Sequence, residues 1–225
     1  MTPNSEIINW GNIFSKSAEF QTNTPFQFAF IENWLQKDFY EKLYETYPKI
    51  DKSWGTSSDL SRFQFYRYCT TGKGGIPVLP GDDPDLSEYW NLLKKTAEST
   101  EFCENFTKFS GVKLNHLKFF EFIAYRQGGF QLPHIHNVGP NTLILMIYFS
   151  KNWKQGSPGG TYMASEPDES SIIFEPYNLD NSLALFHDSP NAVHGVRYIT
   201  DDVERRALQI TLEYFSEDTG WSGDK

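Results

Sequence analysis

The stretch that decides the fold runs from residue 117 to residue 149, where LKFFEFIAYR (117–126), FQLPHIH (130–136) and TLILMIYF (142–149) follow one another across short turns. Each run is rich in the aromatic and branched aliphatic residues that are typical of β-strands. Further short runs of the same kind follow, separated by turn residues, at 160–165, 171–175, 182–187, 193–198 and 205–214. About eight short strands at this spacing predict an all-β sandwich or barrel, of which the double-sheet jelly roll is one solution.

The first half of the chain mixes strand and helix patterns. Residues 26–32 alternate as a strand does, and residues 37–47 carry aromatic and aliphatic side chains at helical spacing until Pro48 ends the run. Residues 87–109 also predict helix, with Ser87 as a candidate cap. Residues 52–85 are rich in Gly, Ser, Asp and Pro and predict a long irregular segment, a feature that often forms a functional lid.

These patterns predict one domain over residues 1–225, mainly β with flanking α-helices. Residues 1–114 are expected to form an N-terminal support whose helices pack on one sheet of the β-structure. Residues 115–215 form the jelly-roll core, and residues 216–225 form a C-terminal tail. Nothing in the sequence indicates an oligomeric state.

Composition narrows the functional classes. The formal net charge is −9, which argues against a nucleic-acid partner, because such proteins usually show a basic patch. The N-terminus lacks a basic region followed by an apolar run, so we expect no signal peptide and a cytoplasmic location. The most apolar stretch, residues 142–149, is too short to span a bilayer, so no membrane partner is expected. Cys69 and Cys103 are expected to be buried thiols.

Histidines cluster in the second half: four of the five lie between residues 134 and 194. His134 and His136 are two residues apart, so on a strand both side chains point to one face. With the more distant His194 they can form a facial metal site that leaves positions open for other ligands. His187 is more typical of a loop position, and Asp188 is an alternative carboxylate ligand.

Five segments around these histidines follow one another in a particular order: YRQGGFQLPHIH (125–136), IYFSKNW (147–153), SPGGT (157–161), LFHDSPNAVHGV (185–196) and RRALQI (205–210). In this order and spacing they resemble the Fe(II)/2-oxoglutarate-dependent dioxygenases, specifically the prolyl-hydroxylase-like branch. The resemblance covers about residues 117–215, roughly half of the chain.

The resemblance implies a double-stranded β-helix with iron at its mouth. It implies His134 as the first iron ligand and His194 as the distal one, with Arg205 pairing with the far carboxylate of 2-oxoglutarate and Tyr148 helping to hold it. The family usually carries Asp or Glu where this chain has His136, so we expect a three-histidine variant of the site. The implied cofactors are Fe(II) and 2-oxoglutarate as cosubstrate, with ascorbate as a further candidate.

Strand parity favours Arg205 over its neighbour Arg206 as the cosubstrate anchor. One face of the last predicted strand is apolar and should pack on helices; it carries Arg206, Leu208, Ile210 and Leu212. The other face is small and polar and should line the cavity; it carries Arg205, Ala207, Gln209 and Thr211.

The expected function is therefore hydroxylation of a C–H bond in a small molecule or a peptide, with 2-oxoglutarate and O₂ converted to succinate and CO₂. The substrate is an amino acid, a peptidyl residue or a small metabolite. Arg126 and Gln131 are candidates for substrate contact at the mouth of the barrel. Two alternatives stay open: a cupin-type three-histidine metalloenzyme that does not use 2-oxoglutarate, and a non-catalytic jelly-roll binding protein.

Overall fold

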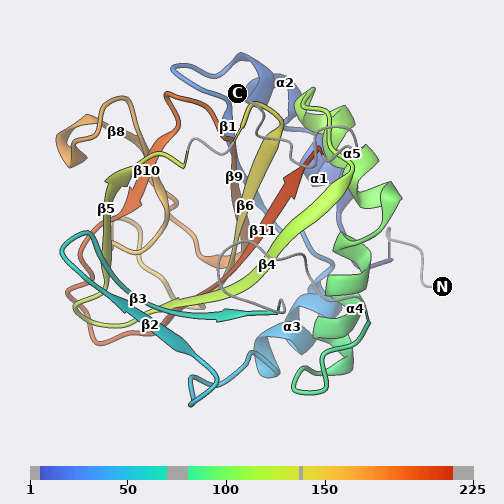
Figure 1. Cartoon of the computed structure of the whole chain (residues 1–225), viewed down its shortest axis with the longest axis horizontal. Coiled ribbons are helices and arrows are strands. Elements are labelled where there is room, and N and C mark those ends of the chain that lie inside the picture. Colours follow the sequence, from blue (N-terminus) through green and yellow to red (C-terminus); the bar gives the residue numbers. More distant parts are fainter. Residues whose placement is uncertain (1–5, 70–80, 137–138, 215–225) are drawn as a thin grey trace.

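The computed structural model describes residues 6–69, 81–136 and 139–214. Within them, eleven strands form one sheet that curls round on itself (Figure 1). Its order is β1-β9-β6-β11-β4-β3-β5-β10-β7-β8, with β2 on the side of β3, and every pairing is antiparallel. The strands are β1 (Phe28–Glu32), β2 (Gly55–Ser58), β3 (Arg62–Tyr68), β4 (His116–Tyr125), β5 (Phe130–His134), β6 (Thr142–Phe149), β7 (Tyr162–Ala164), β8 (Ile172–Phe174), β9 (Asp180–His187), β10 (Val193–Val196) and β11 (Arg205–Glu213). The predicted jelly-roll fold class is confirmed.

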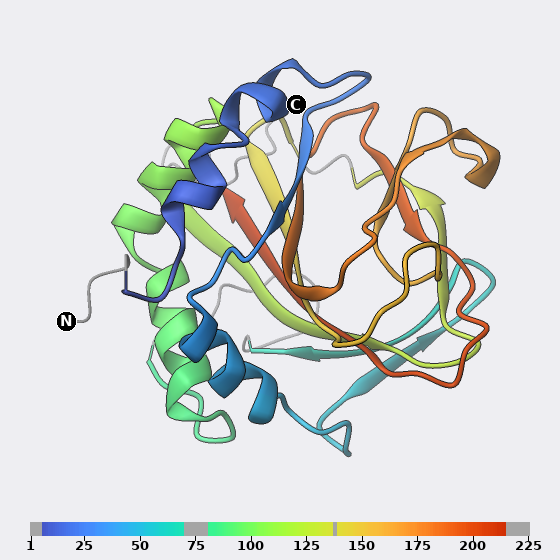
Figure 2. The same cartoon turned by 180° about the vertical axis from the view of Figure 1, so that it is seen from behind.

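Helices cover one outer side of the curled sheet, as two opposite views show (Figures 1 and 2). They are α1 (Trp10–Phe14), α2 (Ser17–Thr22), α3 (Lys37–Glu45), α4 (Glu88–Ala97) and α5 (Thr100–Ser110). The helix predicted over residues 87–109 is split in two at Ser99, which caps α5 as Ser87 caps α4: each hydroxyl accepts from a backbone N–H three residues on. The sequence pattern did not predict α1 and α2, because both helices are too short to show a clear amphipathic repeat.

The two largest apolar cores of the described residues lie on opposite faces of the sheet. One lies between the helices and the outer face of the sheet, and Trp90 is at its centre, with its ring 4.7 Å from that of Phe122 and 5.0 Å from that of Phe149. The other lies inside the curl and includes Ile144 and Ala207. Much of the aromatic content of the chain is used in the first core.

The predicted parity of β11 is confirmed. Leu208, Ile210 and Leu212 are buried in the core beneath the helices, whereas Gln209 and Thr211 line the cavity inside the curl. Residues 205 and 206 therefore point to opposite sides of the sheet. Arg206 lies outside, where it pairs with Glu204.

The prediction of an irregular segment over residues 52–85 is wrong for the first part of that range. Residues 55–58 and 62–68 form β2 and β3, and β3 lies between β4 and β5 in the sheet. Within the run RFQFYRY, polar and aromatic residues alternate over residues 62–65 only, and the turn-forming composition of the neighbouring residues obscured that short pattern. Residues 70–80 and the predicted tail 216–225 lie outside the described residues.

No helix among the described residues is both long and apolar enough to cross a lipid bilayer. Cys69 and Cys103 are both buried and free, as expected.

Candidate metal centre and active-site cavity

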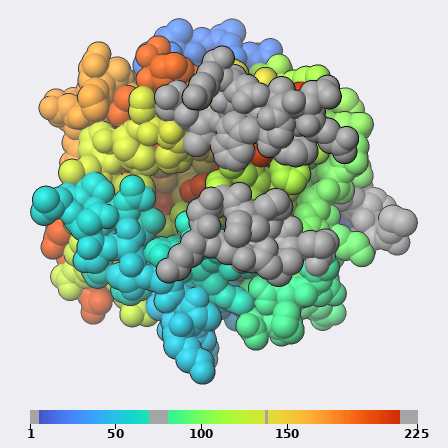
Figure 3. Space-filling model, in the orientation of Figure 1, coloured from blue at the N-terminus to red at the C-terminus, as the bar shows by residue number. Residues whose placement is uncertain are grey.

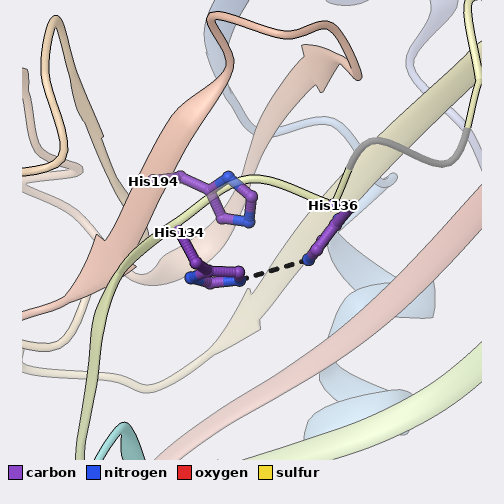
Figure 4. Close-up of side chains that lie close together, drawn as sticks. All are labelled: His134, His136 and His194. Carbon is purple, nitrogen blue, oxygen red and sulfur yellow. Dashed lines mark hydrogen bonds between the residues drawn. The ribbon is translucent and has the colours of Figure 1, made fainter.

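The three predicted ligand histidines converge at one end of the curled sheet. His134 ends β5 and is the direct cross-strand partner of His194 on β10. His136 lies two residues beyond the end of β5, so this strand is shorter than the predicted range 130–136. The ring of His136 nevertheless points toward the rings of His134 and His194 (Figure 4). One ring nitrogen from each histidine lies within 4.8 Å of the other two. This is the spacing of three ligands around one metal ion.

Backbone carbonyls orient two of the rings. His134 Nδ1 lies 3.0 Å from the carbonyl oxygen of Leu132, and His194 Nδ1 lies 2.8 Å from that of Ala192. A carbonyl only accepts, so each Nδ1 carries the proton and each Nε2 presents a lone pair to the shared centre. A hydrogen bond of this kind fixes the tautomer and orientation of a metal-binding histidine.

Burial keeps the rings neutral. Desolvation lowers the pKa of His136 to about 3, with further lowering by the charges of His134 and Arg62. Desolvation likewise holds the pKa of His134 below its ordinary value and that of His194 well below it. Neutral imidazole is the form that binds a metal, so the site is ready for one at neutral pH.

The histidines open into a cavity of about 430 Å³ inside the curl. Figure 3 shows the hollow on this face of the molecule, beside the cyan segment that carries β2 and β3. The walls come from strands far apart in sequence, and the polar side chains among them are Arg62, Gln64, Tyr68, Glu121, Tyr125, Gln131, Thr161, Gln209 and Thr211. The volume is in the range of small-molecule sites.

Arg205 is a fully buried cation beside this cavity. Its side chain has no solvent exposure and lies between the rings of Tyr125 and Tyr148, with Cζ 4.9 Å and 5.0 Å from the ring centroids. Nη2 donates to Thr161 Oγ1 at 3.1 Å, but Nε and Nη1 have no hydrogen-bond partner. No carboxylate of the described residues forms an ion pair with it. A buried, unpaired guanidinium is costly unless an anion binds there.

Tyr148 is also fully buried, and its hydroxyl accepts a hydrogen bond from the backbone N–H of Thr161 at 2.9 Å. Thr161 thus connects the two residues predicted to hold the cosubstrate, because its hydroxyl accepts from Arg205. Thr161 itself lines the cavity. Arg205, Tyr148 and Thr161 form one contiguous polar group that reaches the cavity through Thr161.

Gly195 lies next to His194, where β10 packs tightly between β5 and β7. A Cβ at this position would lie 2.4 Å from the hydroxyl of Tyr162 and 2.7 Å from the carbonyl oxygen of Gln131. Only glycine fits such a close approach. The histidine–glycine pair thus sets how near His194 comes to His134.

The other sequence candidates lie in different places. Gln131 lines the cavity, and its side-chain nitrogen lies 3.2 Å from His134 Nε2. Arg126 instead forms a surface ion pair with Glu204. His187 hydrogen bonds to Gln27 and to the carbonyl of Pro140, away from the cluster. Asp188 is not in the metal-ligating group found among the described residues.

Sequence reasoning missed several cavity residues, above all Arg62, Glu121 and Thr161. Glu121 alternates with Phe119 and Ile123 on the inner face of β4, so the parity argument used for β11 would have found it. Arg62 was hidden in the segment that we expected to be irregular.

No family model matches the chain, and no curated protein matches it by sequence. Solved structures do. A prolyl-4-hydroxylase from Pseudomonas putida superposes with a TM-score of 0.61 at 12% identity, covering 89% of this chain and 98% of that one. A 2OG-Fe(II) oxygenase family oxidoreductase from Burkholderia pseudomallei gives a TM-score of 0.63 at 10% identity, covering 96% of this chain and 95% of that one.

A third structure is a prolyl hydroxylase from Trichoplax adhaerens in complex with a peptide fragment of the hypoxia inducible factor oxygen degradation domain. Its TM-score is 0.61 at 14% identity, with 91% of this chain and 88% of that chain covered. The chain therefore has the jelly-roll fold of prolyl-hydroxylase-like 2-oxoglutarate oxygenases, and the resemblance drawn from sequence is confirmed at the level of fold.

Proposed function

We propose that this chain is an Fe(II)- and 2-oxoglutarate-dependent oxygenase that hydroxylates a C–H bond of an amino acid, a peptidyl residue or a small metabolite. The observation that carries the proposal is the position of Arg205. Its guanidinium is fully buried, has no ion pair, and donates a hydrogen bond to Thr161, which lines the cavity where the three histidines converge. Neither feature alone would indicate this chemistry, because a shared fold hosts many functions.

The histidine cluster fits a metal. His134, His136 and His194 would hold it through neutral imidazole nitrogens, and three protein ligands leave positions open for other molecules. Iron bound there supplies the chemistry of oxidative decarboxylation of 2-oxoglutarate and hydroxylation by O₂. His136 in place of a carboxylate leaves the metal with one more positive charge, which strengthens its hold on anionic ligands.

The polar group around Arg205 fits the far carboxylate of 2-oxoglutarate. Nε and Nη1 of Arg205 are donors without a partner, and a guanidinium binds a carboxylate through two charge-assisted hydrogen bonds. The Thr161 hydroxyl is bonded to Arg205 and the Tyr148 hydroxyl to the backbone of Thr161, so both would orient the carboxylate. The surrounding rings of Tyr125 and Tyr148 exclude water, which strengthens the ion pair.

Product analysis tests this function. Protein incubated with Fe(II), 2-oxoglutarate, ascorbate and O₂ in the presence of amino acids, peptides or small metabolites should release succinate in proportion to hydroxylated product. Arg205→Ala should abolish succinate release. A cupin-type three-histidine metalloenzyme would keep its activity in that variant, and a non-catalytic binding protein would release no succinate in either form.

A further inference from the structure

Two charged side chains line the cavity without any role in the site described above. Glu121 comes from the inner face of β4, and Arg62 comes from the start of β3. Both share the cavity with the three histidines. Neither belongs to the metal cluster or to the polar group around Arg205.

Glu121 is a carboxyl group in an unusual place for one, since only 7% of it is exposed. In the sheet it is the direct partner of Tyr68 on β3 and of Gln209 on β11, and both of these also line the cavity. The Tyr68 hydroxyl donates a hydrogen bond to the carboxylate. No cation of the described residues forms an ion pair with it.

Arg62 is the complementary charge. It pairs in register with Gln131 on β5, close to the metal cluster, and its positive charge lowers the pKa of His134 and of His136. Its Nε is buried and has no hydrogen-bond partner. Its guanidinium makes no ion pair within the described chain, although its charge acts on Glu121 through space: burial raises the pKa of that carboxyl group, and the charge of Arg62 partly offsets the rise.

A guanidinium and a buried carboxyl group on the walls of one cavity, with no ion pair between them, are matched by a ligand that carries both opposite charges, because an ammonium group beside Glu121 favours the ionised form of that carboxyl group. We propose that Glu121 and Arg62 form the primary-substrate subsite and that the substrate is a free amino acid, with its ammonium bound by Glu121 and its carboxylate by Arg62. This inference rests on the proposed oxygenase function. Among the substrate classes proposed for that function, it selects the free amino acids.

Two features favour a free amino acid over a peptide. A residue within a peptide has its amine and carboxyl group tied up as amides, so it offers no zwitterion to the two side chains. The cavity, at about 430 Å³, must also hold 2-oxoglutarate, so the space suits a second small molecule.

Binding measurements on the full chain test the inference without turnover. The protein with Mn(II) and 2-oxoglutarate is screened by thermal shift against the common free amino acids, and the best binder is measured by calorimetry. The analogue without the amine and the analogue without the carboxylate should each bind about 10- to 100-fold more weakly, because each loses a charge-assisted hydrogen bond. This ligand series needs no protein variant.

Variants then assign each charge to a residue. Glu121→Gln should weaken the amino acid about 10- to 100-fold but leave the affinity of the analogue without the amine unchanged. Arg62→Met should likewise weaken binding of the amino acid about 10- to 100-fold but leave the affinity of the analogue without the carboxylate unchanged. Matched controls are Glu41→Gln and Arg126→Met, which break ion pairs with Lys151 and Glu204 outside the cavity and should leave binding unchanged.

The inference is overturned if no free amino acid binds, or if removing the amine or the carboxylate leaves affinity unchanged. It is also overturned if an N-acetylated, C-amidated peptide binds more tightly than the free amino acid. Binding of 2-oxoglutarate in the same samples separates the two claims. If 2-oxoglutarate binds and no amino acid does, only this inference fails. If an amino acid binds through Glu121 and Arg62 but 2-oxoglutarate does not bind, the oxygenase function fails.

Discussion

His134 and His194 are direct cross-strand partners in the β5–β10 pair, and their ring centroids are 4.3 Å apart. Each ring lies next to the backbone carbonyl two residues before it in the chain, so the same local geometry occurs on both strands. Strand register and two backbone hydrogen bonds therefore hold two ligand nitrogens together before any metal arrives. This preorganisation predicts how the site responds to substitution.

Removal of any one of the three histidines should weaken metal binding. Replacement of His134, His136 or His194 by Ala leaves two ligands, and we expect Fe(II) affinity to fall by more than the roughly 10- to 100-fold typical of losing a ligand's hydrogen-bond partner. Anaerobic titration against a competing chelator measures this. His187→Ala is the matched control, because His187 is bonded to Gln27 and Pro140 and should leave affinity unchanged.

His136→Asp should retain the metal, since a carboxylate also binds Fe(II) at such a site. The assignment of His136 as a ligand is wrong if His136→Asp abolishes metal binding while His136→Ala does not.

Arg205→Met should separate ligand binding from stability. Without 2-oxoglutarate the variant should be as stable as the wild type or more stable, because a buried unpaired charge is replaced by an apolar side chain of similar length. With 2-oxoglutarate the melting temperature of the wild type should rise, and that of the variant should not. Differential scanning calorimetry compares the two, with Arg206→Met as control because Arg206 lies on the helix side of β11. A marked loss of stability in ligand-free Arg205→Met would contradict the assignment.

Gly195→Ala should disturb the metal centre from outside it. The added methyl group would lie 2.4 Å from the Tyr162 hydroxyl and 2.7 Å from the Gln131 carbonyl oxygen, so β10 must move away from β5. We expect a loss of stability of about 1–3 kcal/mol, as for overpacking elsewhere, together with weaker Fe(II) binding. Denaturant unfolding and metal titration on the same sample give both values. Normal stability with normal metal affinity would mean that this contact does not position His194.

The stability of the protein should depend on pH through Glu121. Burial raises the pKa of Glu121 from 4.5 to about 8 in the folded chain. Between these two pH values the folded state keeps a proton that the unfolded state has released, so stability falls as pH rises through this window. Glu121→Gln has no such proton. The free energy of unfolding of the variant, relative to that of the wild type, should therefore rise by a few kcal/mol between pH 5 and pH 8. Urea unfolding at several pH values measures both proteins. If the two free energies of unfolding change with pH in the same way, the carboxyl group of Glu121 does not have a raised pKa.

The sequence predicted those parts of the fold that depend on local pattern. The alternation of apolar and polar residues located the strands after residue 115, and the parity of residues 205–212 separated the buried arginine from its exposed neighbour. The HxH pair and His194 converge as expected, because antiparallel pairing brings β5 and β10 together.

The parts that were missed depend on long-range contacts. β3 lies between β4 and β5, far from its neighbours in sequence, so nothing local showed that Arg62 would share a cavity with Glu121. The local parity places Glu121 on the same face of β4 as Phe119 and Ile123, but only the tertiary fold shows that this face lines the cavity with Arg62. The hydrogen bond between Arg205 and the Thr161 hydroxyl likewise joins residues 44 positions apart in the chain.

The most direct test of the central claim is the visible spectrum of the full chain with Fe(II) under anaerobic conditions, before and after addition of 2-oxoglutarate. Chelation of the keto acid by iron at His134, His136 and His194 predicts a weak charge-transfer band that appears on addition of 2-oxoglutarate and is lost in Arg205→Ala. A chain that binds Fe(II) and gives no band with 2-oxoglutarate, or a band that persists unchanged in Arg205→Ala, would contradict the account.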